Sequence, residues 1–176
     1  HVEGAGHGQR TDLPAYVPHM AAAALLASET RPRCDGVDDA ALINLRGTAL
    51  DTMQDSDGLV SIRLWVEGRR VTSVSRHRLA ALAKVEAAMR AGRLTDGGDF
   101  VAALAQAIST ELDPQVADLG DRLDDCEGML DDGDIYVLRR KIAVLRSQAI
   151  VLRRFVAPDR DALSAMAQLG FEWISK

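Results

Sequence analysis

The sequence predicts an α+β fold in which a strand-rich first half is followed by a helical second half, packed as one unit. Two patterns indicate this. Residues 59–75 alternate apolar and polar side chains on both sides of a short turn, which is the period of a β-strand. From residue 79 onward the apolar side chains recur three and four positions apart, which is the period of a helix. The change from strands to helices therefore falls near residue 76.

The elements before residue 59 are short. Val2 begins or ends a short strand, and residues 18–27 form an early helix. Residues 41–46 alternate in the manner of a strand that ends near Gly47. The polar stretch 51–58 predicts a loop, with Asp57-Gly58 as a turn signal.

The stretch 59–78 predicts a β-hairpin leading into a helix. Its first strand is expected to be half-buried, and Gly68 supplies the positive φ that a tight turn needs. Residues 70–75 return with β-branched side chains, which favour a strand. Residues 79–89 then predict a helix that stops at Gly92.

The second half predicts a long antiparallel helical hairpin that turns near Gly133. Two runs of apolar residues step by about 3.5 positions, the spacing at which two helices pack along their length. The residues are Leu119, Leu123, Cys126 and Leu130 in the first arm, and Leu138, Ile142, Leu145, Ala149, Leu152 and Val156 in the second. Pro114 predicts a kink or a one-turn break in the first arm, and Pro158 predicts the end of the second. Residues 159–169 then form another short helix, closed by Gly170.

Composition limits the classes of function. The chain has 176 residues and a formal net charge of −5, which argues against a dedicated nucleic-acid binder. Cys34 and Cys126 lie far apart in the sequence, which fits reduced cytosolic thiols better than a disulfide framework. No apolar run reaches the roughly 20 residues of a membrane span. The chain begins at His1, so we expect a trimmed piece of a protein that is soluble as given.

Acidic residues cluster where the hairpin turns. The candidate metal ligands are Asp121, Asp124, Asp125, Asp131, Asp132 and Asp134. Clustered carboxylates suit hard cations such as Mg²⁺ or Ca²⁺. Arginine and lysine residues follow from 139 to 154, so a second explanation is that opposite charges face one another across the two helices, or face water. The spacing matches no defined ligand loop, which favours this second explanation.

No phosphate-binding loop, metalloprotease helix or nucleophile elbow is present, so we predict no enzyme activity and no catalytic residues. Two alternatives remain open on the residues alone. One is a stand-alone interaction module that uses the helical hairpin. The other is a small cytosolic enzyme with an unrecognised site.

Several segments together resemble one protein family. They are ETRPRC at 29–34, ALINLRG at 41–47, DGLVSIRLWVEGRRVTSVSRHRL at 57–79, and PDRDALSAMAQ and FEWIS near the C-terminus. In this order they are similar to the cytoplasmic domain of CorA-superfamily divalent cation transporters, above all the ZntB-like zinc transporter branch. The resemblance covers nearly the whole chain.

The resemblance implies one cytoplasmic domain over 1–176, with an α/β/α sheet layered between helices. Its parts would be a strand-rich region at 1–92, a helical hairpin at 93–169, and the start of a truncated stalk helix at 170–176, near Trp173. It further implies a homopentamer in an inner (plasma) membrane, attached only through helices that this chain lacks. Zinc or magnesium would be the transported or regulatory ion, and the domain would regulate and assemble the transporter. No cofactor and no nucleic-acid partner are expected.

Overall fold

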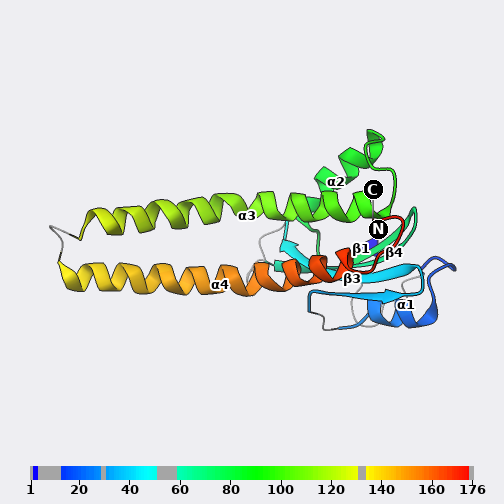
Figure 1. The fold of residues 1–176 in the computed structure, drawn as a ribbon, viewed down its shortest axis with the longest axis horizontal. Coiled ribbons are helices and arrows are strands. Elements are labelled where there is room, and N and C mark those ends of the chain that lie inside the picture. The colour runs from blue at the N-terminus through cyan, green and yellow to red at the C-terminus, as the bar shows by residue number, and fades with distance from the viewer. Residues whose placement is uncertain (1, 4–12, 29–30, 51–58, 131–133, 175–176) are drawn as a thin grey trace.

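The computed structural model describes residues 2–3, 13–28, 31–50, 59–130 and 134–174. A small sheet lies at one end, and two long helices project from it side by side (Figure 1). The elements in chain order are β1 (Val2–Glu3), α1 (His19–Leu25), β2 (Arg33–Val37), β3 (Ala40–Thr48), β4 (Leu59–Glu67), β5 (Arg70–Ser75), α2 (Ala80–Arg90), α3 (Gly97–Gly128) and α4 (Ile135–Ala167).

The sheet has five strands in the order β1-β5-β4-β3-β2. Strands β2 to β5 pair antiparallel, and β1 pairs parallel with β5. Gly68 has a φ of 56° in the turn between β4 and β5, which confirms the predicted hairpin. Strand β2 was not expected, because the spacing of residues 33–37 shows no alternation of apolar side chains.

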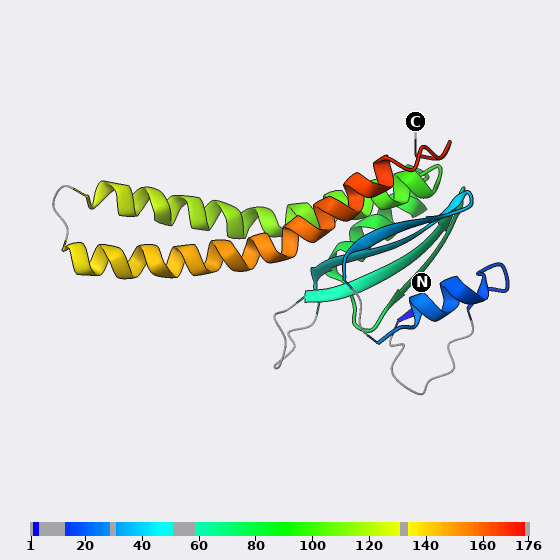
Figure 2. The ribbon, with the colours of Figure 1, turned by 60° about the horizontal axis from the view of Figure 1, so that its bottom comes forward.

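Helices cover both faces of the sheet (Figure 2). On one face α1 packs through Ala21 and Leu25 against Leu42 and Trp65. On the other face, α2, α3 and the end of α4 bury the apolar side chains of the paired strands β3 and β4. These side chains include Ala41, Ile43, Leu45, Ile62, Leu64 and Val66. The α/β/α layering is therefore confirmed.

The expectation that β4 is half-buried was wrong. Arg63 and Trp65, on the side that the alternation marked as outward, are each only 3% exposed. Helix α1 covers that side, so the strand is buried on both faces through most of its length.

The long helices run through both of their prolines. Helix α3 contains Pro114, so of the two alternatives predicted there the one-turn break is wrong and the kink stays a prediction. Helix α4 contains Pro158, so the predicted end of the second arm and the separate short helix predicted over 159–169 were wrong. A proline removes one backbone hydrogen bond from a helix, and packing elsewhere can outweigh that loss. Beyond Pro158, Ala162 and Met166 insert into the core of the sheet and hold the helix in register. Gly170, with a φ of 66°, follows the end of α4.

The hairpin seam is narrower than the sequence pattern predicted. Cys126, Leu138 and Leu145 form its buried cluster, with Leu119 and Met129 packed against them. Leu123, Leu130 and Ile142 are 47%, 65% and 43% exposed. Asp134 caps α4 by accepting a hydrogen bond from the N–H of Tyr136 at 2.8 Å. The predicted turn near Gly133 and the predicted loop at 51–58 lie outside the described residues.

Candidate functional site

The predicted metal ligands do not converge in the described part of the hairpin. Asp121, Asp124 and Asp125 lie exposed near the end of α3, and Asp134 is engaged in capping α4. Asp131 and Asp132 lie outside the described residues. Among the residues that the structure describes, no group of three or more His, Cys, Asp or Glu side chains is placed to hold a metal ion. A metal site at these six aspartates stays a prediction.

The hairpin charges face solvent rather than each other. Arg122 pairs with Asp118 of its own helix at 3.3 Å and donates to the side-chain oxygen of Gln148 at 2.9 Å. Within the described ranges, no acid of α3 forms an ion pair with an arginine or lysine of α4. The apolar seam joins the two helices, and Arg122 and Lys141 add hydrogen bonds across it to Gln148 and Met129.

The two cysteines do not form a zinc site. Cys34 lies in β2 and Cys126 is buried in the hairpin seam, and both are free. Burial, reinforced by the charge of Asp35, raises the pKa of the Cys34 thiol to about 11. Because zinc binds the thiolate form, this shift opposes metal binding at Cys34 near neutral pH.

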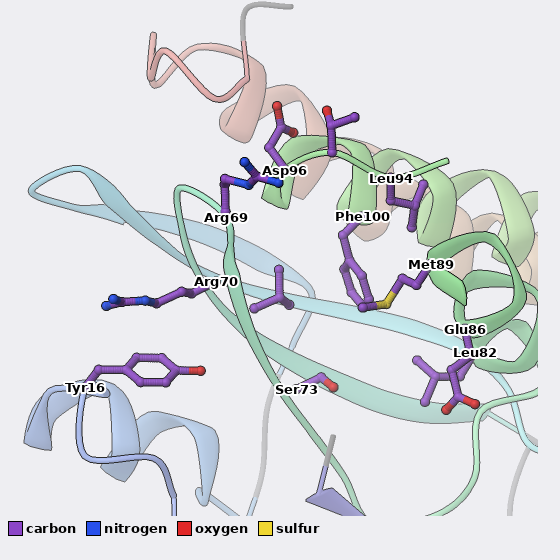
Figure 3. Close-up of a pocket in the computed structure, with 12 residues that line it drawn as sticks. Tyr16, Arg69, Arg70, Ser73, Leu82, Glu86, Met89, Leu94, Asp96 and Phe100 are labelled. Carbon is purple, nitrogen blue, oxygen red and sulfur yellow. The ribbon is translucent and has the colours of Figure 1, made fainter. Parts of the chain in front are cut away.

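The first cavity lies between β5, α2, the start of α3 and Tyr16 (Figure 3). Its volume is about 550 Å³. Its apolar lining includes Leu82, Met89, Leu94 and Phe100, and its charged lining is Arg69, Arg70, Glu86 and Asp96. The Tyr16 hydroxyl lies 2.7 Å from the Thr72 hydroxyl, and the Arg70 guanidinium stands 5.3 Å from the Tyr16 ring centroid.

A second cavity of about 580 Å³ lies on the other side of the β4–β5 turn. Arg69 and Arg70 line this cavity as well as the first. The other residues that line it include Asp39, Glu67, Glu172 and Trp173. The sequence around Gly68, Arg69 and Arg70 gave no indication of either cavity. Each cavity forms between elements that are distant in sequence.

Trp173 fastens the chain segment after α4 to the rest of the fold. Its indole N–H donates to the backbone carbonyl oxygen of Asp39 at 2.9 Å, and its ring stacks on Phe171 with 5.3 Å between centroids. At Gly98, near the start of α3, an added Cβ would overlap the carbonyl oxygen of Trp173. The end of the described chain is thus fixed to the turn before β3 and to the base of the hairpin.

Replacing Trp173 by Phe tests this attachment. The change removes the donor to the Asp39 carbonyl, and we expect it to lower the free energy of unfolding by about 1–2 kcal/mol more than Trp65→Phe does. Trp65 is the matched control, because it is similarly buried but its indole N–H has no partner among the described residues. Urea denaturation followed by circular dichroism measures both variants. Equal losses would show that the Trp173 hydrogen bond contributes nothing.

No helix in the described residues has the length and apolar content that crossing a membrane requires.

The buried Arg63 lies under α1 and donates to the carbonyl oxygen of Ala27 at 2.8 Å. Burial, followed by the nearby charge of Arg76, lowers its pKa. This contact positions the end of α1, and it adds no reactive group to the fold.

Comparison with known proteins gives the fold and the sequence a common explanation. The family model for a CorA-like Mg²⁺ transporter protein matches residues 2–175. The zinc transport protein ZntB of Klebsiella pneumoniae is 33% identical over 160 residues, which are 90% of this chain and 49% of that protein. The chain spans about half the length of the curated relatives it matches.

Two solved structures share the fold. The full-length CmaX protein superposes with a TM-score of 0.72 and 29% identity, covering 92% of this chain and 50% of that one. The ZntB cytoplasmic domain of Vibrio parahaemolyticus gives a TM-score of 0.71 at 19% identity, covering 90% and 64%, which shows the fold alone. The matched family is one of transporters and not of enzymes, which agrees with the predicted lack of enzyme activity. Because the family model covers nearly every residue, the chain belongs to the CorA-like Mg²⁺ transporter family.

Proposed function

We propose that this chain is the cytoplasmic regulatory and assembly domain of a divalent metal ion transporter of the ZntB-like branch. The observation that carries the proposal is the family match over residues 2–175, together with the 33% identity to a zinc transport protein. The transported ion would be zinc or magnesium. The protein would sit in the inner membrane as a homopentamer, with this domain on the cytoplasmic side.

The proposed mechanism is mechanical coupling between the sheet, the hairpin and a stalk helix that begins after Trp173. The contacts of Trp173 with Asp39 and Gly98 support it, because they join the exit of the chain to both the sheet and the base of α3. Movement of the hairpin would therefore be transmitted to the stalk helix. In this scheme 1–92 and 93–169 form the two parts of one domain, and 170–176 leads into the stalk.

The same scheme gives the aspartates near the hairpin turn a regulatory role. Their oxygen ligands favour a hard cation such as Mg²⁺, whereas a tight zinc site needs thiolate or imidazole ligands. Zinc preference, if the transporter has it, would arise outside this chain. Exposed carboxylates without a preformed cage hold a divalent ion weakly, with a dissociation constant of about 1 mM.

Calorimetric titration of this chain with Mg²⁺ and Zn²⁺ tests the regulatory site. We expect weak Mg²⁺ binding that disappears in the triple variant Asp121→Asn, Asp124→Asn, Asp125→Asn. A control variant, Asp113→Asn, Asp118→Asn, Asp161→Asn, removes the same charge away from the turn and should leave binding unchanged. If both triple variants weaken binding equally, the ion responds to net charge and not to a site. If the parent chain binds no ion, a self-contained site is excluded.

The transporter assignment has a separate test in the gene. The sequence that follows Lys176 should encode two stretches of about 20 apolar residues, with a Gly-x-Asn motif after the first. A stop codon soon after Lys176 would overturn the assignment. It would instead favour the stand-alone interaction module, for which the exposed apolar residues of the hairpin would then be the natural surface.

A further inference from the structure

The sheet buries one positive charge that no acidic side chain of the described residues balances. Arg63 of β4 is 3% exposed, and its guanidinium donates to a neutral acceptor, the carbonyl oxygen of Ala27, at 2.8 Å. Its Nε–H is buried and has no hydrogen-bond partner in the described part of the chain. No described carboxylate lies within ion-pair distance of it. Burial of a cation in this way is costly, because its hydration is lost and no opposite charge replaces it.

Helix α1 is the element that covers this charge. Ala27 comes two residues after the end of α1, so the guanidinium meets the carbonyl end of the helix, where the helix dipole is negative. The last turn of α1 has no basic residue of its own, and Arg63 supplies the cation from the sheet. A helix end carries only about half an elementary charge, so it offsets the guanidinium only in part.

The other contacts that hold α1 on the sheet are modest. Its buried residues are Ala21 and Leu25, and Val17 joins the same apolar cluster from the segment before the helix. At this front end the Tyr16 hydroxyl lies 2.7 Å from the Thr72 hydroxyl. A helix of seven residues is not stable by itself in water, so α1 keeps its shape only while it is docked.

Release of α1 would return two buried polar groups to water. One is the guanidinium of Arg63. The other is the indole N–H of Trp65, which is buried without a partner among the described residues and lies under α1 two positions along the same strand. The charge of Arg76 adds to the cost of the closed state, because after burial itself it is the second cause that lowers the pKa of Arg63. Apolar burial therefore favours docking of α1, and the polar groups beneath it oppose docking.

We propose that residues 13–27, with α1 at their centre, form a strap that opens from the sheet as one unit while the rest of the fold stays intact. The unbalanced charge of Arg63 sets how often the strap opens. Helix α1 lies on the face of the sheet away from α3 and α4, so its opening leaves their contacts unbroken (Figure 2). The closed strap hides a cationic and aromatic surface of the sheet, and the open strap presents it.

Hydrogen exchange of the 176-residue chain, followed by NMR, tests the strap. The indole N–H of Trp65 is the most direct probe, because it has no hydrogen bond to break and its exchange reports only the loss of its cover. We expect this group and the backbone amides of α1 to share one opening equilibrium, about a hundredfold more favourable than that of β3 and β4. The indole N–H of Trp173, which donates to the Asp39 carbonyl, should stay protected. Exchange of α1 only together with β3 and β4 would overturn the proposal.

Arg63→Met tests the role of the buried charge. Methionine keeps an unbranched apolar side chain in place of the guanidinium, so opening of the strap should become about tenfold rarer. Arg93→Met is the matched control, because Arg93 is exposed after α2 and its loss should leave the exchange of Trp65 and α1 unchanged. Faster exchange in Arg63→Met would show that the hydrogen bond to Ala27 anchors the strap, and the proposed role of the charge would be wrong.

Tyr16→Phe tests the strap without any change inside the sheet, and it remains informative if Arg63→Met does not fold. The variant lacks the hydroxyl that lies 2.7 Å from the Thr72 hydroxyl, so opening should become about fivefold more frequent. Tyr136→Phe makes the same chemical change at a side chain of α4 that is 81% exposed, and it should have no effect on α1. Equal exchange of α1 in these two variants would overturn the proposal.

Discussion

Gly97→Ala should destabilise the chain by about 3 kcal/mol. Gly97 is the first residue of α3, and its N–H donates to the carbonyl oxygen of Gly68 at 2.8 Å. An added Cβ would overlap Cγ1 of Val66 and lie 2.8 Å from the Gly68 oxygen. Val66 is fully buried in the sheet core and Gly68 is part of a tight turn, so neither can move aside at low cost.

The same helix supplies the control for this prediction. Gly120 lies in the exposed part of α3, and an added Cβ there meets no atom within 4 Å. Because alanine loses less backbone entropy than glycine in a helix, Gly120→Ala should stabilise the chain by about 0.5–1 kcal/mol. Urea denaturation of the two variants gives changes of opposite sign if contact with Val66 decides the outcome. Stabilisation by both changes would show that the start of α3 can shift away from the sheet.

The Gly97 contact also shows why the hairpin direction could not be read from the sequence. Gly97 and Gly98 belong to no recognisable sequence motif. Gly97 nevertheless packs on the β4–β5 turn, and Gly98 packs on Trp173, more than 70 residues away. These two close approaches set the angle at which α3 leaves the sheet. Local spacing predicted the helices and the strands well, because periodicity reflects which side of each element is buried. It carries no information on which distant backbone a glycine will meet.

The errors at the prolines and at β4 have a related cause. A local rule marks Pro158 as a helix end, but the burial of Ala162 and Met166 against the sheet stabilises the helix beyond it. Alternation marks Arg63 and Trp65 as outward, but α1 covers them. The large apolar ring of Trp65 on the supposed polar side was the one local signal of that second layer. Tertiary packing decided each of these cases.

The candidate site was predictable only in part. The sequence placed the aspartates near the hairpin turn, and the structure puts the described ones there. Carboxylate spacing along a helix does not state whether the side chains converge on one point, and Asp134 is engaged as a helix cap. The cavities beside Arg69 and Arg70, and the position of Asp159 against β3, depend on contacts between distant segments and had no counterpart in the sequence pattern.

Asp159→Asn should remove a pH dependence from the stability of the chain. Asp159 follows Pro158 in α4, and its two carboxylate oxygens accept hydrogen bonds from the backbone N–H of Arg46 at 3.1 and 3.2 Å. This N–H lies beyond the last residue of β3 that pairs with β2, so Asp159 takes the place of a strand partner. Burial raises the pKa of Asp159 to about 7, although the Arg46 N–H and the Arg46 charge act in the opposite direction.

The sign of the effect follows from where the proton binds. The ordinary pKa of this carboxyl is 3.8, and the folded value is higher, so the folded state holds the proton more tightly than the unfolded state. Stability should therefore fall as the pH rises from about 4 to about 7, and it should level off above that. A full shift of this size corresponds to roughly 4 kcal/mol, and partial solvent screening reduces the expected loss to about 1–2 kcal/mol.

Asparagine cannot ionise and keeps one oxygen for the Arg46 N–H, so Asp159→Asn should be more stable than the parent at pH 8 and similar to it at pH 4. Asp161→Asn is the control, because Asp161 lies two residues away on the surface with Arg160 as its partner. Urea denaturation of all three proteins across this pH range separates Asp159 from the histidines, whose titration is common to them. A parallel pH profile for parent and Asp159→Asn would mean that the carboxylate is better hydrated than its burial implies. A difference confined to neutral and higher pH would instead show that the contact between Asp159 of α4 and Arg46 of β3 is weaker when Asp159 is charged. Because this contact attaches the hairpin to the sheet, the strength of that attachment would then depend on pH.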